Sequence, residues 1–180
     1  MIHYDVISRT IVGDVLIAAT SRGLCAVLFG KDAGGALEKR LAVMFPGEPA
    51  GRNRSRLAPY RREIDEYFAG KRPRFTLPID LSAVRSPFQR KVLRKLHALP
   101  FGRVTTYGDL AARSGSPGAA RAVGTAMSKN PVALVIPCHR VVGAAGSLGG
   151  FSGGLSKKKT LLVHEGVAPT KSGLLKAGGR

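Results

Sequence analysis

The chain has 180 residues, of which 44% are hydrophobic, so it can bury the core of one domain or of two small ones. Two cysteines are too few for a disulfide framework, and no CxxC motif or Cys/His cluster points to a metal site. The 29 Lys and Arg residues against 11 Asp and Glu residues give a net charge of +18. That charge favours a polyanionic partner, nucleic acid first, although a ribosome-associated or membrane-surface protein would be equally basic.

Residues 1–81 alternate strand and helix signals and are predicted to form a small mixed N-terminal α/β domain. Three runs rich in Val, Ile and Leu are predicted to pair as an antiparallel meander with Cys25 in its core. These runs are Tyr4–Ser8, Val12–Thr20 and Leu24–Phe29. Helical spacing of apolar residues predicts two helices, Ala36–Phe45 and Leu57–Phe68, and a further strand is predicted over Phe75–Leu81.

Residues 86–169 are predicted to form a mainly helical C-terminal domain, which makes the fold class α/β (α+β). Ser86 and Pro87 open one helix as N-cap and first helical residue. Two short helices over 105–114 and 118–129, joined by a tight glycine-containing turn, are typical of a helix-turn-helix. A last helix is predicted over 155–165, and residues 170–180 are expected to form a disordered basic tail.

The glycine-rich segment Gly143–Gly154 lies between the cysteine motif described next and the last predicted helix. A flexible linker is the usual meaning of such a segment. Because the cysteine motif fixes one end of the segment and the predicted helix fixes the other, we interpret it instead as the wall of a pocket. Glycines there let the backbone approach a flat ligand closely.

The segment Pro137-Cys138-His139-Arg140-Val141 sets a thiol beside an imidazole and a guanidinium. A cysteine is a strong nucleophile only as a thiolate, so it needs a base or a positive field nearby. The preceding apolar run Ala133–Ile136 predicts a buried strand, and along an extended chain neighbours point to opposite sides, so His139 need not touch the sulfur. The alternative is a buried structural cysteine beside a surface His and Arg.

In this context the chain resembles the O6-alkylguanine-DNA alkyltransferases (methylated-DNA–protein-cysteine S-methyltransferases). The matching pieces follow the family's order at compatible spacings. They are Thr106-Tyr107-Gly108, Ala120-Arg121-Ala122-Val123-Gly124, Asn130-Pro131, Ile136-Pro137-Cys138-His139-Arg140-Val141 and Leu161-Leu162-Val163-His164-Glu165-Gly166. The resemblance covers about the C-terminal half, whereas the N-terminal segment matches only in general organisation.

The resemblance implies that Cys138 takes an alkyl group from guanine O6 in double-stranded DNA, with no cofactor and no metal, and is consumed. It implies that His139 deprotonates Cys138 through a bridging water, that Glu165 orients His139, and that Tyr107 donates toward the departing base. From the residues alone, Glu165 is equally a solvated acid at a helix end, although the helix dipole disfavours a carboxylate there.

The resemblance further implies that the target nucleotide is rotated out through the minor groove while Arg121 fills the gap. The alternatives are that Arg121 contacts a phosphate or is only a solvated surface residue. The other DNA-binding residues that it implies are Asn130, Thr106, Ala122, Gly124 and Thr125. Asn130 corresponds to the family's hinge residue, whose amide joins the helix-turn-helix to the active-site segment. Alternatively, Asn130 is only the C-cap of the preceding helix.

The substrate pocket implied by the family consists of Pro137, Val141, Phe151 and Ser152. Val141 and Ser152 would meet the guanine edge through their main chains, and Pro137 and Phe151 would be apolar walls. Phe151 stands where many members have Tyr, and Leu93 where members often have Trp. The range of alkyl groups, activity on O4-alkylthymine and cooperativity on DNA stay open.

Other functions compete with alkyl transfer. A lesion-binding relative without catalysis would lack Cys138, and a methylation-sensing transcription regulator would need a further module with metal-ligating cysteines. A cysteine hydrolase built on Cys138, His139 and Glu165 leaves the basic charge unexplained. We expect a monomer. We expect it in the cytoplasm and not at a membrane, because the sequence has no signal-peptide pattern and no apolar run of membrane-spanning length. The two cysteines could form one disulfide, but so few cysteines favour a reducing compartment.

Overall fold

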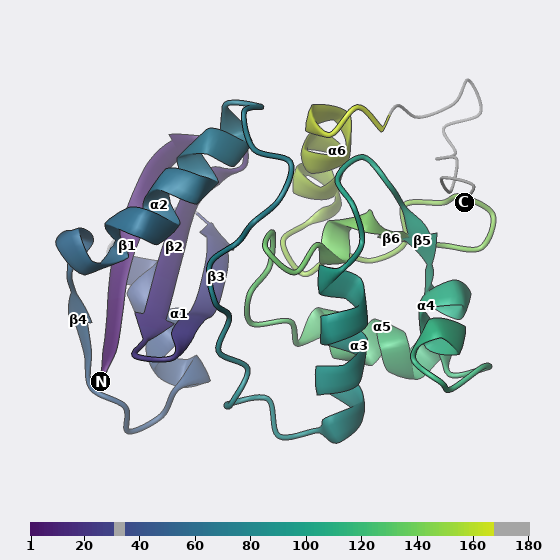
Figure 1. Ribbon diagram of the computed structural model, residues 1–180, viewed down its shortest axis with the longest axis horizontal. Helices are drawn as coiled ribbons and strands as arrows, with labels where there is room; N and C mark the ends of the chain where they lie inside the picture. Colours follow the sequence, from purple (N-terminus) through teal and green to yellow (C-terminus); the bar gives the residue numbers. More distant parts are fainter. Residues whose placement is uncertain (31–34, 168–180) are drawn as a thin grey trace. The chain divides into compact units, whose positions relative to one another are not determined.

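The computed structural model describes residues 1–30 and 35–167, which form two compact units (Figure 1). Among the described residues, the first unit comprises those within 1–83 together with Pro131–Ala133, and the second comprises Val84–Asn130 and residues 134–167. The predicted basic tail, residues 170–180, lies outside the described residues.

The first unit is built on a four-stranded sheet of order β3-β2-β1-β4. The strands β1 (Ile2–Thr10), β2 (Gly13–Thr20) and β3 (Gly23–Gly30) pair antiparallel, which confirms the predicted meander. The short strand β4 (Ala50–Arg52) adds to β1 in parallel and was not predicted. Its three residues carry no strand signal of their own, and the pairing comes from the neighbouring β1.

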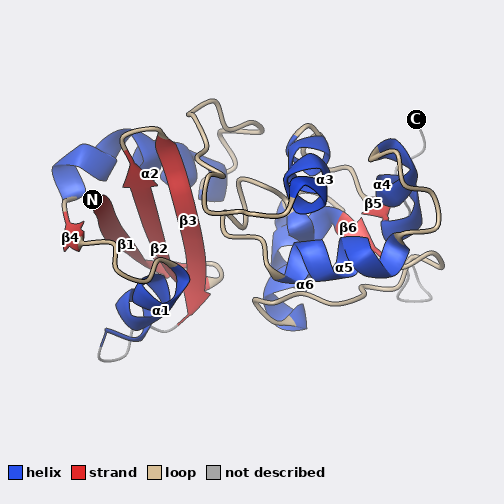
Figure 2. Cartoon of the chain, turned by 90° about the horizontal axis from the view of Figure 1, so that it is seen from below, coloured by secondary structure: helices blue, strands red, loops and turns tan. Residues whose placement is uncertain are grey.

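Helices α1 (Ala36–Met44) and α2 (Arg54–Phe68) cover opposite faces of this sheet (Figures 1 and 2). Successive strand residues point to opposite faces, so each strand can supply apolar side chains to both helices. Leu37 and Leu41 of α1 pack into one core cluster, in which Cys25 lies 2% exposed as predicted. Burial, assisted by the charge of Asp80, raises the pKa of the Cys25 thiol to about 12.

The predicted strand over Phe75–Leu81 is wrong. Within it a single parallel bridge joins Ile79 to Leu24, with the Leu24 N–H donating to the Pro78 carbonyl over 2.9 Å. Pro78 has no N–H to donate to a ladder, so this apolar run cannot extend the sheet regularly.

The second unit is mainly helical (Figure 2). Its helices are α3 (Pro87–His97), α4 (Tyr107–Arg113), α5 (Ala120–Ser128) and α6 (Leu155–His164). Ser86 caps α3 by accepting from the Gln89 N–H, which confirms the predicted start of that helix. Helices α4 and α5 are the two predicted short helices, and a turn with positive φ at Gly115 and Gly118 joins them.

The second unit also contains a short two-stranded parallel sheet. Strand β5 (Thr105–Thr106) pairs with β6 (Val141–Val142), with Thr106 opposite Val142. Thr106 is also the N-cap of α4 and accepts from the Asp109 N–H over 3.0 Å. The pairing therefore sets the start of α4 beside the segment that follows Cys138.

The apolar run Ala133–Ile136 is buried as expected, but it is not a strand. Leu134 has φ 75° and turns the chain, and the neighbouring Val132 forms one isolated bridge to Val27. The run lies between Pro131 and Pro137, neither of which can donate to a ladder. The side-chain amide of Asn130 closes the turn instead, donating to the Ile136 carbonyl over 2.9 Å.

Candidate active site

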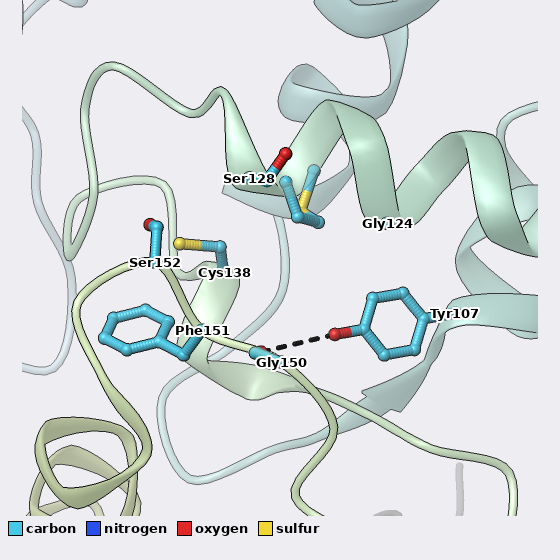
Figure 3. A pocket seen from close by; sticks show the side chains of 8 residues that line it. Tyr107, Gly124, Ser128, Cys138, Gly150, Phe151 and Ser152 are labelled. Carbon is cyan, nitrogen blue, oxygen red and sulfur yellow. Dashed lines mark hydrogen bonds between the residues drawn. The ribbon is translucent and has the colours of Figure 1, made fainter.

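A cavity of about 390 Å³ opens in the second unit, between the start of α4, helix α5 and the glycine-rich loop (Figure 3). It is lined by Tyr107, Gly124, Met127, Ser128, Cys138, Gly150, Phe151 and Ser152. The Cys138 sulfur points toward the Ser152 side of the cavity. Of the expected pocket residues, Phe151 and Ser152 lie on the wall, whereas Pro137 and Val141 are buried and are absent from the lining.

Cys138 begins a short 3-10 turn, Cys138–Arg140, rather than continuing a strand. The alternation expected of an extended chain therefore does not apply to Cys138 and His139. Burial raises the pKa of the Cys138 thiol, and four groups counter this by stabilising the thiolate. They are the side chain of Asn130, the charge of Lys158 and the backbone N–H groups of Cys138 and His139.

His139 is fully buried and its Nε2 lies 2.8 Å from Oε1 of Glu165. Burial lowers the pKa of His139, although the Glu165 carboxylate counters this, so the imidazole is neutral at pH 7. A neutral ring that donates through Nε2 keeps a lone pair on Nδ1. That Nδ1 is buried and has no hydrogen-bond partner within the described part of the chain, which suits it to act as a base.

Glu165 is 4% exposed at the C-cap of α6, so the solvated-acid interpretation is wrong. Arg140 holds it with a fork: Nε donates to Oε2 over 2.7 Å and Nη2 to Oε1 over 2.9 Å. The Gly102 N–H also donates to Oε2 over 3.3 Å. Burial would raise the pKa of Glu165, but the hydrogen bonds and charges of His139 and Arg140 hold it well below its usual range.

Arg140 is a site residue that the sequence analysis did not assign. Its Nη1 donates to the Leu99 carbonyl over 2.6 Å while the rest of the guanidinium pairs with Glu165. The sequence does contain a reason to assign it. A carboxylate at a helix C-terminus, such as Glu165, needs a compensating cation, and Arg140 is adjacent in sequence to His139, the expected partner of Glu165.

Lys158 is the second residue that the sequence analysis missed. Its side chain is fully buried, and Nζ donates to the carbonyls of Val141 (2.6 Å), Gly150 (3.2 Å) and Leu148. Burial lowers the pKa of Lys158 to about 8, although the nearby Cys138 favours its charged form. The run Lys157–Lys159 looks like a solvated charge cluster, and only helical spacing separates its middle member. Lys158 shares one face of α6 with Leu161, Leu162 and Glu165.

Tyr107 is the first residue of α4 and lies opposite Phe151 across the cavity. Its hydroxyl donates to the Gly150 carbonyl over 3.4 Å. Burial raises the pKa of Tyr107, with a further contribution from the charge of Cys138, so the phenol keeps its proton and acts as a donor.

The expected DNA-binding residues divide into two groups. Arg121, Ala122 and Thr125 lie exposed on α5, and Gly124 on the same helix lines the cavity. Thr106 and Asn130 instead make contacts within the fold, as the cap of α4 and the clasp of the Asn130–Ile136 turn.

Both cysteines are free thiols. In residues 1–30 and 35–167, no three His, Cys, Asp or Glu side chains are arranged to hold a metal ion. Among the helices of that same part of the chain, none has the length and apolar character needed to cross a membrane.

Two family models match the chain. The DNA binding domain of 6-O-methylguanine DNA methyltransferase matches residues 87–167, and its ribonuclease-like domain matches residues 2–81. The methylated-DNA–protein-cysteine methyltransferase of Mycolicibacterium paratuberculosis is 50% identical over 103 residues, covering 57% of this chain and 61% of that protein. The Salmonella typhimurium protein of the same name is 47% identical over 104 residues, 58% of this chain and 60% of that protein. These alignments thus span about three fifths of each relative.

Solved structures extend the likeness over nearly the whole chain. The Mycobacterium tuberculosis O6-methylguanine methyltransferase is 32% identical with a TM-score of 0.77, covering 92% of this chain and 93% of that one. The Mycobacterium tuberculosis OGT in complex with DNA is 31% identical with a TM-score of 0.77, covering 91% of this chain and 92% of that one. Matching domains in both halves and this shared α+β fold assign the chain to the 6-O-methylguanine DNA methyltransferase family.

Proposed function

We propose that this protein repairs O6-alkylguanine in double-stranded DNA by moving the alkyl group onto its own Cys138, a reaction that we assign to the predicted domain 86–169. The observation that carries the proposal is the Cys138 thiol on the wall of a cavity of about 390 Å³. A cavity of this size suits a small flat ligand. Next to Cys138 in the chain, the buried His139–Glu165 pair can receive the thiol proton.

The transfer is a direct displacement. The Cys138 proton passes to Nδ1 of His139 through a bridging water, and the negative charge of Glu165 stabilises the imidazolium that forms. The thiolate then attacks the alkyl carbon, so that a carbon–sulfur bond forms while the carbon–O6 bond breaks. The bonding electrons leave with guanine, and the Tyr107 hydroxyl donates a hydrogen bond or its proton toward the departing base. The proton that left Cys138 balances the one that guanine gains, so Tyr107 and His139 end in their starting protonation states. The thioether product has no leaving group, so each molecule reacts once.

Within the pocket, Phe151 supplies apolar surface, and the main chain of Ser152 recognises the guanine edge. Pro137 and Val141 are buried and do not line the cavity, so we assign them no contact with the base. Phe151 has no hydroxyl, so that contact of the family's tyrosine is missing here.

DNA binding and extrusion are assigned to α5. The target atom is buried in a duplex, so the nucleotide must be rotated out, with Arg121 filling the gap through the minor groove. The small residues Ala122, Gly124 and Thr125 allow α5 to approach the duplex closely. Asn130 ties the end of α5 to the cysteine segment through the Ile136 carbonyl, and Thr106 sets the start of α4. The cytoplasm is the proposed compartment, because the reaction needs a reduced thiol.

Intact-mass measurement after incubation with duplex DNA containing O6-methylguanine tests the proposal. Wild type should gain the mass of one methylene, which peptide mapping should locate at Cys138. Cys138→Ser should gain nothing yet bind DNA nearly as well, and Cys25→Ser should react like wild type. Methylation of Cys138→Ser at a comparable rate, or an unmodified wild type, would refute the proposal.

A further inference from the structure

Helix α3 has a buried face and a basic face. Val92, Leu93 and Leu96 are buried in the second unit. The opposite side forms a groove of about 620 Å³, which we call the α3 groove. It is lined by Pro87, Arg90, Lys91, Arg94, Lys95 and Ala98. None of these residues lines the cavity that contains Cys138.

The four cations of the α3 groove are not paired with any acid that the structure describes. None of them forms an ion pair within residues 1–30 and 35–167, and α3 itself contains no Asp or Glu. Several arginines of the first unit are paired: Arg61 pairs with Asp5 over 2.9 Å and Arg72 with Glu66 over 2.7 Å. The α3 groove differs from these sites because its four cations gather on one helix face and none of them is paired with a described acid.

The composition of the second half explains this difference. Residues 1–83 contain 13 Lys and Arg against nine Asp and Glu, whereas residues 84–180 contain 16 against two. Those two acids are Asp109 and Glu165, and Glu165 is already held by Arg140. The second half therefore has almost no carboxylate with which to neutralise α3.

The arrangement of the four cations favours a polymer of phosphates over a single anion. Arg90 and Arg94, and likewise Lys91 and Lys95, are like-charged neighbours one helical turn apart, about 6 Å along the axis. Such pairs repel each other on a helix, and Arg90 and Lys91 also lie near its positive end. A duplex carries a negative charge for every ~1.7 Å of its axis, so it can meet all four cations at once.

We propose that the α3 groove binds the phosphodiester backbone of a second duplex segment, separate from the one whose base enters the cavity. The buried face of α3 packs toward α5, and Gln89 Nε2 donates to the Lys129 carbonyl beyond the end of α5 over 3.0 Å. The basic face of α3 is thus directed away from α5. This inference goes beyond the proposed repair reaction and does not need it, because undamaged DNA is sufficient for its test.

The test counts duplexes bound per protein, using undamaged duplexes of about one helical turn, on the order of 10 base pairs. The test variant replaces Arg90, Lys91, Arg94 and Lys95 with Gln, a residue that favours helix as they do. The control variant replaces Lys39, Arg54, Arg56 and Lys71 with Gln. These four residues are exposed and form no ion pair within the described part of the chain. Their replacement removes four positive charges, as many as the test variant loses. Circular dichroism checks that each variant is folded.

At low salt, sedimentation should show two duplexes bound to wild type and to the control variant, but one bound to the test variant. The milder pair Arg94→Gln/Lys95→Gln should keep the second duplex with a log–log salt slope shallower by about 1.8, since each phosphate contact contributes about 0.9. Two duplexes on the test variant, or one on the control, would overturn the proposal. So would equal displacement by polyglutamate, which would indicate an acidic protein partner.

The rate of alkyl transfer to Cys138 distinguishes failure of the second-duplex proposal from failure of the repair proposal. With saturating O6-methylguanine duplex, the test variant should methylate Cys138 at the wild-type rate, because the α3 groove is apart from the cavity. Loss of the first duplex together with transfer would mean that α3 belongs to the primary DNA site, and the second-duplex proposal would then be wrong.

Discussion

Lys158 Nζ donates to the Val141 carbonyl over 2.6 Å, so the main-chain group that the resemblance assigned to the guanine edge is engaged within the fold. The same ammonium holds the carbonyls of Leu148 and Gly150 in the glycine-rich loop. One buried charge therefore joins the segment after Cys138 to the opposite wall of the cavity. This makes Lys158 a positioning residue for the pocket and a positive charge that favours the Cys138 thiolate.

Lys158→Met should slow alkyl transfer by up to about 100-fold, the order of loss that follows misplacement of reacting groups. It should also raise the pKa of Cys138, because the charge of Lys158 lowers it. The rate of wild type should rise with pH across the neutral range as the buried thiol ionises, and that rise should move to higher pH in the variant. Single-turnover rates and iodoacetamide labelling against pH measure both effects.

Lys159→Met is the matched control, since Lys159 is the exposed neighbour on the same helix. It should keep the wild-type rate and pH profile. If Lys158 has only a structural role, Lys158→Met should be slower than wild type but have the same pH–rate profile. That result would contradict the proposal that the charge of Lys158 stabilises the Cys138 thiolate.

Glu165→Gln should slow transfer by roughly ten- to ten-thousand-fold, the range for groups that support general-base catalysis. The amide no longer offers a negative charge to the His139 imidazolium that forms during the reaction. Rapid-quench measurement of a single turnover at pH 7 gives the rate. A rate equal to wild type would leave Glu165 with a structural role alone.

The same substitution should reduce stability in a pH-dependent way. At pH 7 it leaves the buried Arg140 guanidinium without its counter-charge, at a cost of about 3–5 kcal/mol. The folded-state pKa of Glu165 lies below its unfolded value, so its stabilisation is complete above the unfolded pKa and is lost as pH falls through the folded one. Urea unfolding should therefore show a wild-type advantage that is constant near neutral pH and narrows in acid.

Glu66→Gln is a control for this measurement, because Glu66 pairs with Arg72 at a side chain that is 35% exposed. It should cost about 1 kcal/mol or less. An advantage of wild type over Glu165→Gln that stays unchanged into strong acid would contradict the charge-based explanation.

Local signals in the sequence were sufficient for much of the fold. Ser86 and Pro87 predicted the start of α3, and strand periodicity predicted the meander, because caps and alternation act over a few residues. The two wrong strands, Phe75–Leu81 and Ala133–Ile136, are apolar runs whose burial was readable but whose backbone path was not. Prolines within or beside them decide that path, and the isolated bridges at Ile79 and at the neighbouring Val132 depend on distant partners.

The site was predictable in part for the same reason. Cys138, His139 and Tyr107 belong to short motifs that can be found in one sequence. The partners Arg140 and Lys158 depend on tertiary packing: the 3-10 turn directs Arg140 to Glu165, and α6 buries the middle lysine of three. A charged residue is assigned to solvent by default, so burial of a cation requires knowledge of what surrounds it.

Gly149→Ala should displace Tyr107. Gly149 has φ +65°, and a Cβ there would lie 3.0 Å from Tyr107 Cε2 and 3.2 Å from its hydroxyl oxygen. Relief of this contact pushes the ring from the cavity wall and breaks its hydrogen bond to Gly150. Transfer should fall by about 100-fold, as for other small misplacements near reacting groups.

Gly47→Ala separates the contact from the backbone effect. Gly47 has φ +78°, and a Cβ there meets no described atom within 4 Å. It should lose about 1–2 kcal/mol of stability from the left-handed conformation and keep its transfer rate. If Gly149→Ala also keeps the wild-type rate, Tyr107 does not have to sit where it does for transfer.

Arg121→Ala distinguishes the two roles of an exposed arginine on α5. A phosphate contact predicts weaker duplex binding, a log–log salt slope shallower by about one unit, and a normal transfer rate at saturating DNA. A residue that fills the vacated stack predicts modest loss of affinity but slow transfer on duplex, because unstacking costs a few kcal/mol and nothing then holds the gap open. We expect the second result.

Two controls accompany this measurement. Reaction of Arg121→Ala with the free base O6-benzylguanine needs no extrusion and should be almost unaffected. Arg113→Ala, which removes an exposed arginine of α4, should transfer the alkyl group at the wild-type rate. Equal losses on duplex and free base would mean that Arg121 supports the pocket, and its extrusion role would have to be abandoned.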